Sequence, residues 1–424
     1  MPSSTAGLAL ALAGESSRRR VCLVLGGHLS SCPRAIKEAD ALHARGHEVL
    51  VLASQTVPAI TEIDGGLERR KPWAVRHVRI HSWGATRRAW SRFQRNRARA
   101  SLLEGAFSES TVLPALTPWA EFHLREIEKF RPALVIGHTL PGLAIAWAAH
   151  RRFGISWVFD LEDFHPAERD GGLDEIGNRI AHLALQAALP GARRVVAASP
   201  FIAREATRAY GREDIEVILN CFPPEKLPPP AAPPPARLSM TWFSQTVGLD
   251  RGLGDVLAAC ALLKGDFDLH LRGSCPTDTA LEILEHARRG GFLPRCHLHP
   301  WCPPDRLIAT LAHHTVGLAL ETGHPPNRDL CITNKILLYP LAGLAVAATR
   351  TLGQQWTMEQ APGMGFLYES GDAKSLARGL QRWLDDPAAL DAARATARHA
   401  AGTVFSWEKE SAKLVALLEK AMAP

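Results

Sequence analysis

A cationic residue opens a predicted helix in the second half of the chain. The segment Asn327 to Thr349 predicts a polar loop, a helix that starts at Asn334 and Lys335, and an apolar strand that follows Gly343. A helix start carries several unpaired backbone N–H groups and about half a positive charge. With Lys335 in the first turn, the sequence predicts an anion site suited to a diphosphate. The alternative is an ordinary strand–helix unit with a solvated lysine.

A second cation lies in a glycine-flanked loop after a predicted strand at 238–244. This loop contains Gln245, Gly248, Arg251 and Gly252. Glycines allow a ligand to approach the backbone, and an arginine before a helix start can clamp a phosphate. The alternative is a solvated arginine at the beginning of a helix.

The first predicted strand ends in two glycines. Gly26 and Gly27 precede His28, and Arg34 follows Pro33 at the start of the next predicted helix. Proline suits the first turn of a helix, and glycines suit close approach of a ligand. The spacing is not the strict Gly-x-Gly-x-x-Gly of dinucleotide sites, which gives dinucleotide binding weak support. The sequence leaves open a ligand-binding loop and a tight strand-to-helix turn.

Two further predicted strands end in polar side chains. His138 follows the strand at 133–137, and the run from Asp160 to His165 ends the next strand. Such residues face the ligand-binding edge of a parallel sheet. The carboxylates of the second run could bind a metal, act as acid and base, or cap a turn. We favour polar contacts of Glu162 and Asp163 with an acceptor molecule over a metal. The alternative for His138 is a histidine that only forms hydrogen bonds within the protein and contacts no ligand.

The composition is that of a two-domain globular protein. The 424 residues exceed what one hydrophobic core usually organises. A net charge of +6 suits a protein that handles anionic ligands and does not demand nucleic acid. The eight cysteines lack Cys-x-x-Cys spacing, which favours reduced thiols in a cytoplasmic compartment over a disulfide or zinc framework. No apolar run approaches the ~18–20 residues of a membrane span.

Apolar strands alternate with helical patterns on both sides of a proline-rich segment. The first set is predicted at 21–26, 48–53, 133–137, 156–160, 193–198 and 215–219, and the second at 238–244, 267–273, 295–299, 314–321, 344–349 and 365–369. Near-continuous apolar strands separated by helices predict parallel sheets covered on both faces. The segment 223–235 is dominated by proline, which favours an extended, semi-rigid linker.

These loops and the Asn334-Lys335 helix start resemble the GT-B glycosyltransferases, particularly glycosyltransferase family 4, from about Val21 to the end of the chain. The resemblance implies an α/β fold with two Rossmann-like, doubly wound parallel-sheet domains that face a cleft. It implies transfer of a sugar from a nucleotide-sugar to an acceptor, with retention of configuration and without a metal or a cofactor. The acceptor, a glycan, a lipid or a small molecule, stays open, and the resemblance implies a role in carbohydrate biosynthesis.

The expected organisation follows from this resemblance. We expect a disordered leader at 1–18, an acceptor domain at 19–222, a linker at 223–237, a nucleotide-sugar domain at 238–400, and a C-terminal helix at 401–424 that packs back on the first domain.

The chain departs from the family pattern in two places. The family usually has an arginine followed six residues later by Lys-Gly, whereas this chain has Gln245 and then Arg251. Two family glutamates correspond to Leu330 and Leu338, which cannot accept hydrogen bonds from sugar hydroxyls. The chain therefore resembles a divergent branch with an Asn-Lys helix start. The nearby polar residues that could substitute are Glu321, Asn327 and Asp329.

The resemblance assigns roles to the candidate residues. We expect catalytic roles for His138, Arg251 and Lys335, with the two cations stabilising the departing diphosphate and His138 orienting the sugar. Donor-binding roles are expected for Gln245, Gly248, Gly252, Gly273, Asn327, Asp329, Thr333 and Asn334. The first-domain loop residues are Gly26, Gly27, His28, Arg34, Glu162 and Asp163. Substitution of Lys335 by alanine is expected to weaken diphosphate binding far more than it changes stability. A nucleotide-sugar epimerase and a non-catalytic binding module are the alternatives.

The segment 87–100 holds six arginines together with Trp90 and Phe93. A basic helix with interleaved aromatic residues is typical of a membrane-surface element, and a mobile solvated loop is the alternative. We expect a cytoplasmic protein that visits the inner face of an anionic membrane and does not bind nucleic acid.

Overall fold

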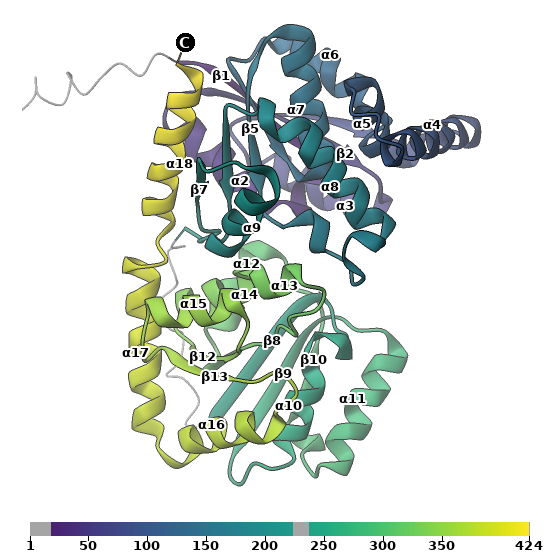
Figure 1. Ribbon diagram of the computed structural model, residues 1–424. Helices are drawn as coiled ribbons and strands as arrows, with labels where there is room; N and C mark the ends of the chain where they lie inside the picture. The colour runs from purple at the N-terminus through teal and green to yellow at the C-terminus, as the bar shows by residue number, and fades with distance from the viewer. Residues whose placement is uncertain (1–17, 224–236, 424) are drawn as a thin grey trace, which may run out of the picture. The chain divides into compact units, whose positions relative to one another are not determined.

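The computed structural model describes residues 18–223 and 237–423 of the chain (Figure 1). The leader predicted at 1–18 lies outside the described residues except for Arg18. The proline-rich linker predicted at 223–237 also lies outside them, except for its two end residues, Pro223 and Arg237.

The first sheet is parallel and has seven strands in the order β3-β2-β1-β4-β5-β6-β7. These strands are β1 (Arg20–Leu25), β2 (Glu48–Gln55), β3 (Ala74–Arg79), β4 (Leu134–His138), β5 (Ser156–Leu161), β6 (Arg194–Ala197) and β7 (Ile215–Val217). The apolar residues of β1 are almost fully buried because the strand pairs with β2 on one side and β4 on the other. The strand order reverses between β1 and β4, and the carboxyl ends of strands at such a point form a ligand site in doubly wound folds.

Helices connect these strands. They are α2 (Pro33–Ala44), α3 (Pro58–Glu68), α4 (Ala85–Leu103), α5 (Glu109–Leu116), α6 (Ala120–Phe130), α7 (Thr139–Phe153), α8 (Ile176–Ala188) and α9 (Pro200–Tyr210). Proline occupies the first helical position of α2, α3 and α9, where its missing N–H costs no hydrogen bond. Helix α7 ends at Gly154, whose φ of 70° suits glycine at a helix C-terminus.

The second sheet is also parallel and has six strands in the order β10-β9-β8-β11-β12-β13. The strands are β8 (Leu238–Thr246), β9 (Phe267–Ser274), β10 (Cys296–His299), β11 (Val316–Ala319), β12 (Ala345–Thr349) and β13 (Gly365–Tyr368). The helices are α10 (Leu253–Cys260), α11 (Thr277–Arg289), α12 (Pro304–Leu311), α13 (Asn327–Leu330), α14 (Asn334–Leu341), α15 (Leu352–Gln360), α16 (Ala373–Asp385), α17 (Pro387–Thr403) and α18 (Trp407–Met422).

Alternation along the strands separates the two faces of the second sheet. Met240 and Trp242 of β8 and Leu269 and Leu271 of β9 pack into one core with α10, α11, α16 and α17. The intervening residues, which include Ser239 and the polar side chains of β9, point to the opposite face, because successive side chains alternate across a strand.

The two sheets confirm the predicted fold class, two Rossmann-like parallel-sheet halves. All twelve predicted strands are present with shifts of a few residues at their ends, and β3 is the strand that the sequence analysis did not identify. By its internal contacts the chain divides into two compact units. The first covers Met1–Phe159, Gly191–Arg194 and Leu417–Pro424, and the second covers Asp160–Pro190 and Val195–Ala416.

The last helix, α18, forms polar contacts with the polypeptide of the first sheet. In the second unit, the Glu410 carboxylate accepts a 2.8 Å hydrogen bond from Leu219 N–H. In the first unit, Arg45 Nε donates to Glu419 Oε1 over 3.0 Å.

Candidate functional site

The predicted helix start at Asn334 and Lys335 is present in the second unit. Helix α14 begins at Asn334 after the N-cap residue Thr333, whose side chain forms no cap hydrogen bond. Lys335 Nζ lies 2.8 Å from Glu321 Oε1 and 5.7 Å from the ring centre of Trp242. Both members of this ion pair are largely buried, with side-chain exposures of 12% and 6%.

The Glu321 carboxylate is surrounded by cations. Burial raises its pKa, but the charges of Lys335, Arg328 and Arg251, with the Lys335 hydrogen bond, lower it by more, so its pKa lies below the usual value. Glu321 is therefore ionised at neutral pH. Three cations thus act on this one carboxylate beside the N-terminus of α14, an arrangement that suits a phosphate ligand.

The glycine-flanked loop after β8 brings Arg251 to this cluster. Gly252 has a φ of +76°, and a Cβ atom there would lie 2.6 Å from the Leu320 carbonyl oxygen. Glycine thus allows the loop to pack against the residue that precedes Glu321. Arg251 keeps 40% of its side chain exposed, 3.8 Å from Asp250 Oδ2, and Gln245 is exposed. Gly273, with a φ of +155°, allows β9 to approach the Ser244 carbonyl in the same way.

Two other predicted donor-binding residues serve as connectors. Asn327 donates from Nδ2 to Asp163 Oδ1 over 2.8 Å and accepts the Phe164 N–H at Oδ1 over 2.7 Å. Both polar ends of this amide are therefore occupied. Asp329 accepts the Leu352 N–H at Oδ1 over 2.9 Å, which ties α13 to the start of α15. These contacts position the segment before α14.

A second asparagine, Asn220, joins the strand ends to α14. Its Nδ2 donates to Glu162 Oε1 over 3.0 Å and to Asn334 Oδ1 over 2.9 Å. Glu162 and Asp163, which the sequence analysis placed with the acceptor, thus lie close to residues placed with the donor. Asp163 contacts Asn327 directly, and Asn220 bridges Glu162 and Asn334. All these contacts lie within the second compact unit.

One hydroxyl at this site is unengaged. Thr333 Oγ1 is buried and has no hydrogen-bond partner among the residues that the structure describes. It sits at the N-cap of α14, next to Lys335, where a phosphate oxygen would accept its hydrogen bond. Leu330 and Leu338, at the positions of the two family glutamates, are buried side chains with exposures of 8% and 5%.

In the first unit, His28 secures a loop. Its Nδ1 lies 2.7 Å from Asp64 Oδ2, and its Nε2 accepts the N–H groups of Thr56 and Val57 over 3.0 and 2.9 Å. Nε2 therefore carries no proton, and Nδ1 donates to Asp64. Burial raises the Asp64 pKa, but hydrogen bonds from Ser30 and His28 lower it by more, so the carboxyl stays ionised. The ring of His28 thus caps the start of α3.

Arg34 and His138 meet at one buried carboxylate. Glu38 Oε2 lies 3.2 Å from His138 Nε2, and Glu38 Oε1 lies 3.5 Å from Arg34 Nε. None of these side chains is more than 2% exposed. Arg34 therefore sits in the interior of the first unit, and the structure links it to His138 through Glu38.

The residue after His138 has an unusual backbone. Thr139 has a φ of +61°, which is rare for a β-branched residue, and its hydroxyl is buried without a partner among the described residues. A Cβ atom at Gly26 would lie 2.3 Å from Thr139 Oγ1, so the glycine makes room for this turn. Gly27 has no atom near its Cβ position. Strained residues cluster at functional sites, and this one lies where the strand order reverses.

The sequence reasoning missed Thr139, Glu38, Asp64 and Asn220. Glu38 could have been found, because it lies four residues after Arg34 on the same helix face. Thr139, Asp64 and Asn220 depend on contacts between segments far apart in the sequence. Removing Lys335 alone would leave the buried Glu321 carboxylate unpaired, so the structure leads us to expect a larger effect of that substitution on stability than the sequence did.

Residues 34–221 match the family model described as the glycosyl transferase 4-like domain. No curated protein matches the chain significantly. Among the solved structures that share the fold over nearly the whole chain are those of the following three proteins. Sucrose-phosphate synthase from Thermosynechococcus elongatus has a TM-score of 0.71 and 17% identity, covering 95% of this chain and 99% of that chain. HepE of Anabaena in complex with UDP has a TM-score of 0.70 and 16% identity, covering 95% and 100%.

The third is a putative UDP-N-acetylglucosamine 2-epimerase from Listeria monocytogenes, with a TM-score of 0.56 and 11% identity, covering 95% and 96%. HepE has also been solved with UDP-glucose, with a TM-score of 0.68 and 17% identity, covering 95% and 100%. At these identities the likeness is one of fold, and the family model adds the domain type. Residues 34–221 therefore match a glycosyltransferase domain model, and the whole chain has the two-domain fold of the GT-B type.

Proposed function

We propose that the protein transfers a sugar from a nucleotide-sugar to an acceptor, with the donor diphosphate at the N-terminus of α14. The observation that carries the proposal is the set of groups around one buried carboxylate. Three positive charges, those of Lys335, Arg251 and Arg328, act on the single negative charge of Glu321. The nearby Thr333 hydroxyl has no hydrogen-bond partner among the described residues. HepE, which shares the fold, binds UDP and UDP-glucose, so a uridine-diphosphate sugar is the donor class to test first.

The proposed chemistry is stabilisation of a leaving group. As the bond between the anomeric carbon and the diphosphate breaks, negative charge grows on the phosphate oxygens. Lys335, Arg251 and the N–H groups of α14 would offset this charge, which is preorganised electrostatic catalysis. The acceptor hydroxyl would form the new bond at the same carbon and release its proton. Retention of configuration, independence from metal, and orientation of the sugar by His138 belong to this proposal.

Calorimetric titration with UDP tests the phosphate site. Arg251 is the best residue to change, because its side chain is 40% exposed and its ion pair with Asp250 is long, at 3.8 Å. Loss of one charged hydrogen bond, worth ~1.5–3 kcal/mol, should make UDP binding by the Arg251→Gln variant at least roughly tenfold weaker. Arg378→Gln, an exposed arginine on α16, is the matched control and should bind like the wild type. Equal affinity of all three proteins would contradict the site.

The second candidate function keeps the fold and the nucleotide-sugar but changes the reaction. Leu330 and Leu338 stand where related transferases have carboxylates, which favours testing a nucleotide-sugar epimerase and a module that binds without turnover. An epimerised donor would indicate the first of these, and binding without product would indicate the second.

We also infer that α4 contacts an anionic membrane surface during carbohydrate biosynthesis at the cytoplasmic face. Trp90 and Phe93 are 59% and 55% exposed, and their ring centres lie 5.6 Å apart. Exposed arginines at positions 87, 88, 92 and 97 flank them. Such a mixture suits the boundary between headgroups and acyl chains. No helix among the described residues is long and apolar enough to span a membrane.

A further inference from the structure

Four histidines and an aspartate gather on the second sheet. Asp268 and His270 alternate along β9, and His297 and His299 alternate along the neighbouring strand β10. His270 lies directly opposite His297 in the parallel register, so their side chains share a face. These side chains occupy the face opposite the one that packs with α10, α11 and α16. His314, just before β11, completes the group.

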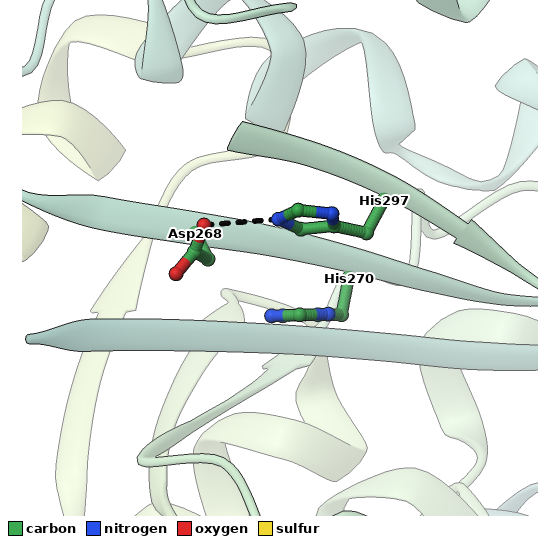
Figure 2. Close-up of side chains that lie close together, drawn as sticks. All are labelled: Asp268, His270 and His297. Carbon is green, nitrogen blue, oxygen red and sulfur yellow. Dashed lines mark hydrogen bonds and ion pairs between the residues drawn. The ribbon is translucent and has the colours of Figure 1, made fainter. Parts of the chain in front are cut away.

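The side chains approach one another closely. His297 Nε2 lies 2.9 Å from Asp268 Oδ1, and the rings of His297 and His270 stack with centres 4.6 Å apart (Figure 2). The ring of His314 lies 4.4 Å from that of His270. One ligand-type atom from each of Asp268, His270 and His297 falls within 4.8 Å of the other two.

We propose that Asp268, His270 and His297 bind a divalent transition-metal ion of the Zn²⁺ type. Two imidazole nitrogens and one carboxylate oxygen are a donor set that Zn²⁺ accepts, and water would complete a tetrahedral shell. In such a shell the ligand atoms lie about 3.4 Å apart, so a side-chain shift on the order of one ångström would close the site. The 37% exposed side chain of His297 gives the ion access from solvent.

Neighbouring groups orient these ligands. His270 Nδ1 lies 2.9 Å from His299 Nε2. Because this contact occupies Nδ1, the other ring nitrogen of His270, Nε2, would be the atom that binds the metal. Arg237 Nε bonds Asp268 Oδ2 over 2.7 Å and so fixes the carboxylate while Oδ1 faces His297. Such outer partners hold metal-bound side chains in the required orientation. Arg272 also faces this region and donates to the Pro300 carbonyl, and with Arg237 it moderates the affinity for a cation.

The proposed ion would fasten an edge strand. β10 pairs only with β9 in the described sheet, and a metal held by His297 and two β9 residues would link the two strands. This structural role is separate from the proposed sugar transfer, in which the ion would take no part.

Metal titration of the full-length chain tests the proposal. The metal-stripped protein would be titrated with Zn²⁺ against a chromophoric chelator, and with Co²⁺ as a spectroscopic probe. We expect one ion per chain in the wild type and at least a tenfold weaker affinity in the His270→Gln and His297→Gln variants. His286→Gln, an exposed histidine of α11, is the matched control and should bind like the wild type.

Further measurements separate this site from alternatives. The chain has eight cysteines, and Co²⁺ bound by thiolates would show sulfur-to-metal charge-transfer absorption. Co²⁺ bound by imidazole nitrogen and carboxylate oxygen would not show this absorption. Zn²⁺ should raise the thermal midpoint of the wild type but not that of a folded Asp268→Asn variant, which removes a ligand and keeps the stacked rings. Sulfur-type Co²⁺ spectra, no wild-type binding at micromolar Zn²⁺, or equal affinity across the variants would overturn the proposal.

Discussion

Lys335 Nζ lies 2.8 Å from Glu321 Oε1, and both side chains are largely buried at the start of α14. The cation that the sequence marks as a phosphate ligand is therefore one half of an ion pair. In the proposed donor site, binding of a diphosphate and stability of the fold would be coupled through this pair. A single substitution at either residue would then change both properties, so a double variant is needed to separate them.

The Lys335→Met variant should be strongly destabilised. Removing one partner of a buried pair leaves an uncompensated charge, which costs about 3–5 kcal/mol. The double variant Glu321→Gln/Lys335→Met removes both charges and should regain most of this loss. Urea denaturation measures the free energies of unfolding, with Lys374→Met on the surface of α16 as control. Equal stability of the single and double variants would show that the pair is not maintained in solution.

The same pair predicts a pH dependence. The Glu321 pKa lies below its usual 4.5 in the folded state, so its ionisation stabilises the fold above pH 4.5. This contribution is lost as the pH falls through the lower folded-state pKa. The difference in unfolding free energy between the wild type and Glu321→Gln should be constant well above pH 4.5 and shrink as the pH falls below it. A difference that stays constant over the whole range would argue against the depressed pKa.

The His28→Ala variant should lose stability and keep its UDP affinity. The ring accepts two backbone N–H groups and bonds a fully buried carboxylate, Asp64. Leaving such groups unsatisfied costs about 2–3 kcal/mol. Thermal and urea unfolding would measure the loss, and His399→Ala on the exposed face of α17 is the control. A His28→Ala variant that is as stable as the wild type but binds UDP more weakly would instead indicate that His28 contacts the ligand.

The architecture could be predicted because apolar strands leave a strong local pattern. Runs such as those of β1 and β12 are buried on both faces, and helices separate them at regular intervals. Strand β3 has no such run, since it lies at the sheet edge and only two of its six residues, Val75 and Val78, are buried. Because Arg76 and His77 interrupt the apolar residues of β3, a search for apolar segments does not find this strand.

The site could be predicted only in part, because the type of a residue does not show which other residue it contacts in the folded chain. The helix start at Asn334 and Lys335 follows from local sequence, and the structure has it. Glu321 lies fourteen residues before Lys335, and no periodicity links the two. Asn220 and Asn334 are separated by 114 residues and meet only in the folded chain. Contacts of this kind need the tertiary structure.

Helix α4 should bind anionic vesicles through its arginines. A variant with Arg88, Arg92 and Arg97 all changed to glutamine loses three charges, each worth ~1 kcal/mol near an anionic bilayer. Co-sedimentation with phosphatidylserine-containing vesicles should fall about a hundredfold in partition coefficient. The control changes Arg289, Arg306 and Arg378, three exposed arginines of the second unit, to glutamine. Equal loss in both variants would indicate a general charge effect without a role for α4.

Turnover of a nucleotide-sugar tests the central claim most directly. The wild-type protein would be incubated with a panel of UDP-, GDP- and ADP-sugars, with and without glycan and lipid acceptors. NMR would identify the sugar product and the configuration at its anomeric carbon. The account predicts release of nucleoside diphosphate together with a glycoside, or slow release of free sugar when acceptor is absent, and loss of this activity in the Arg251→Gln variant. An epimerised donor, or tight binding of the panel with no product under any condition, would contradict sugar transfer by this protein.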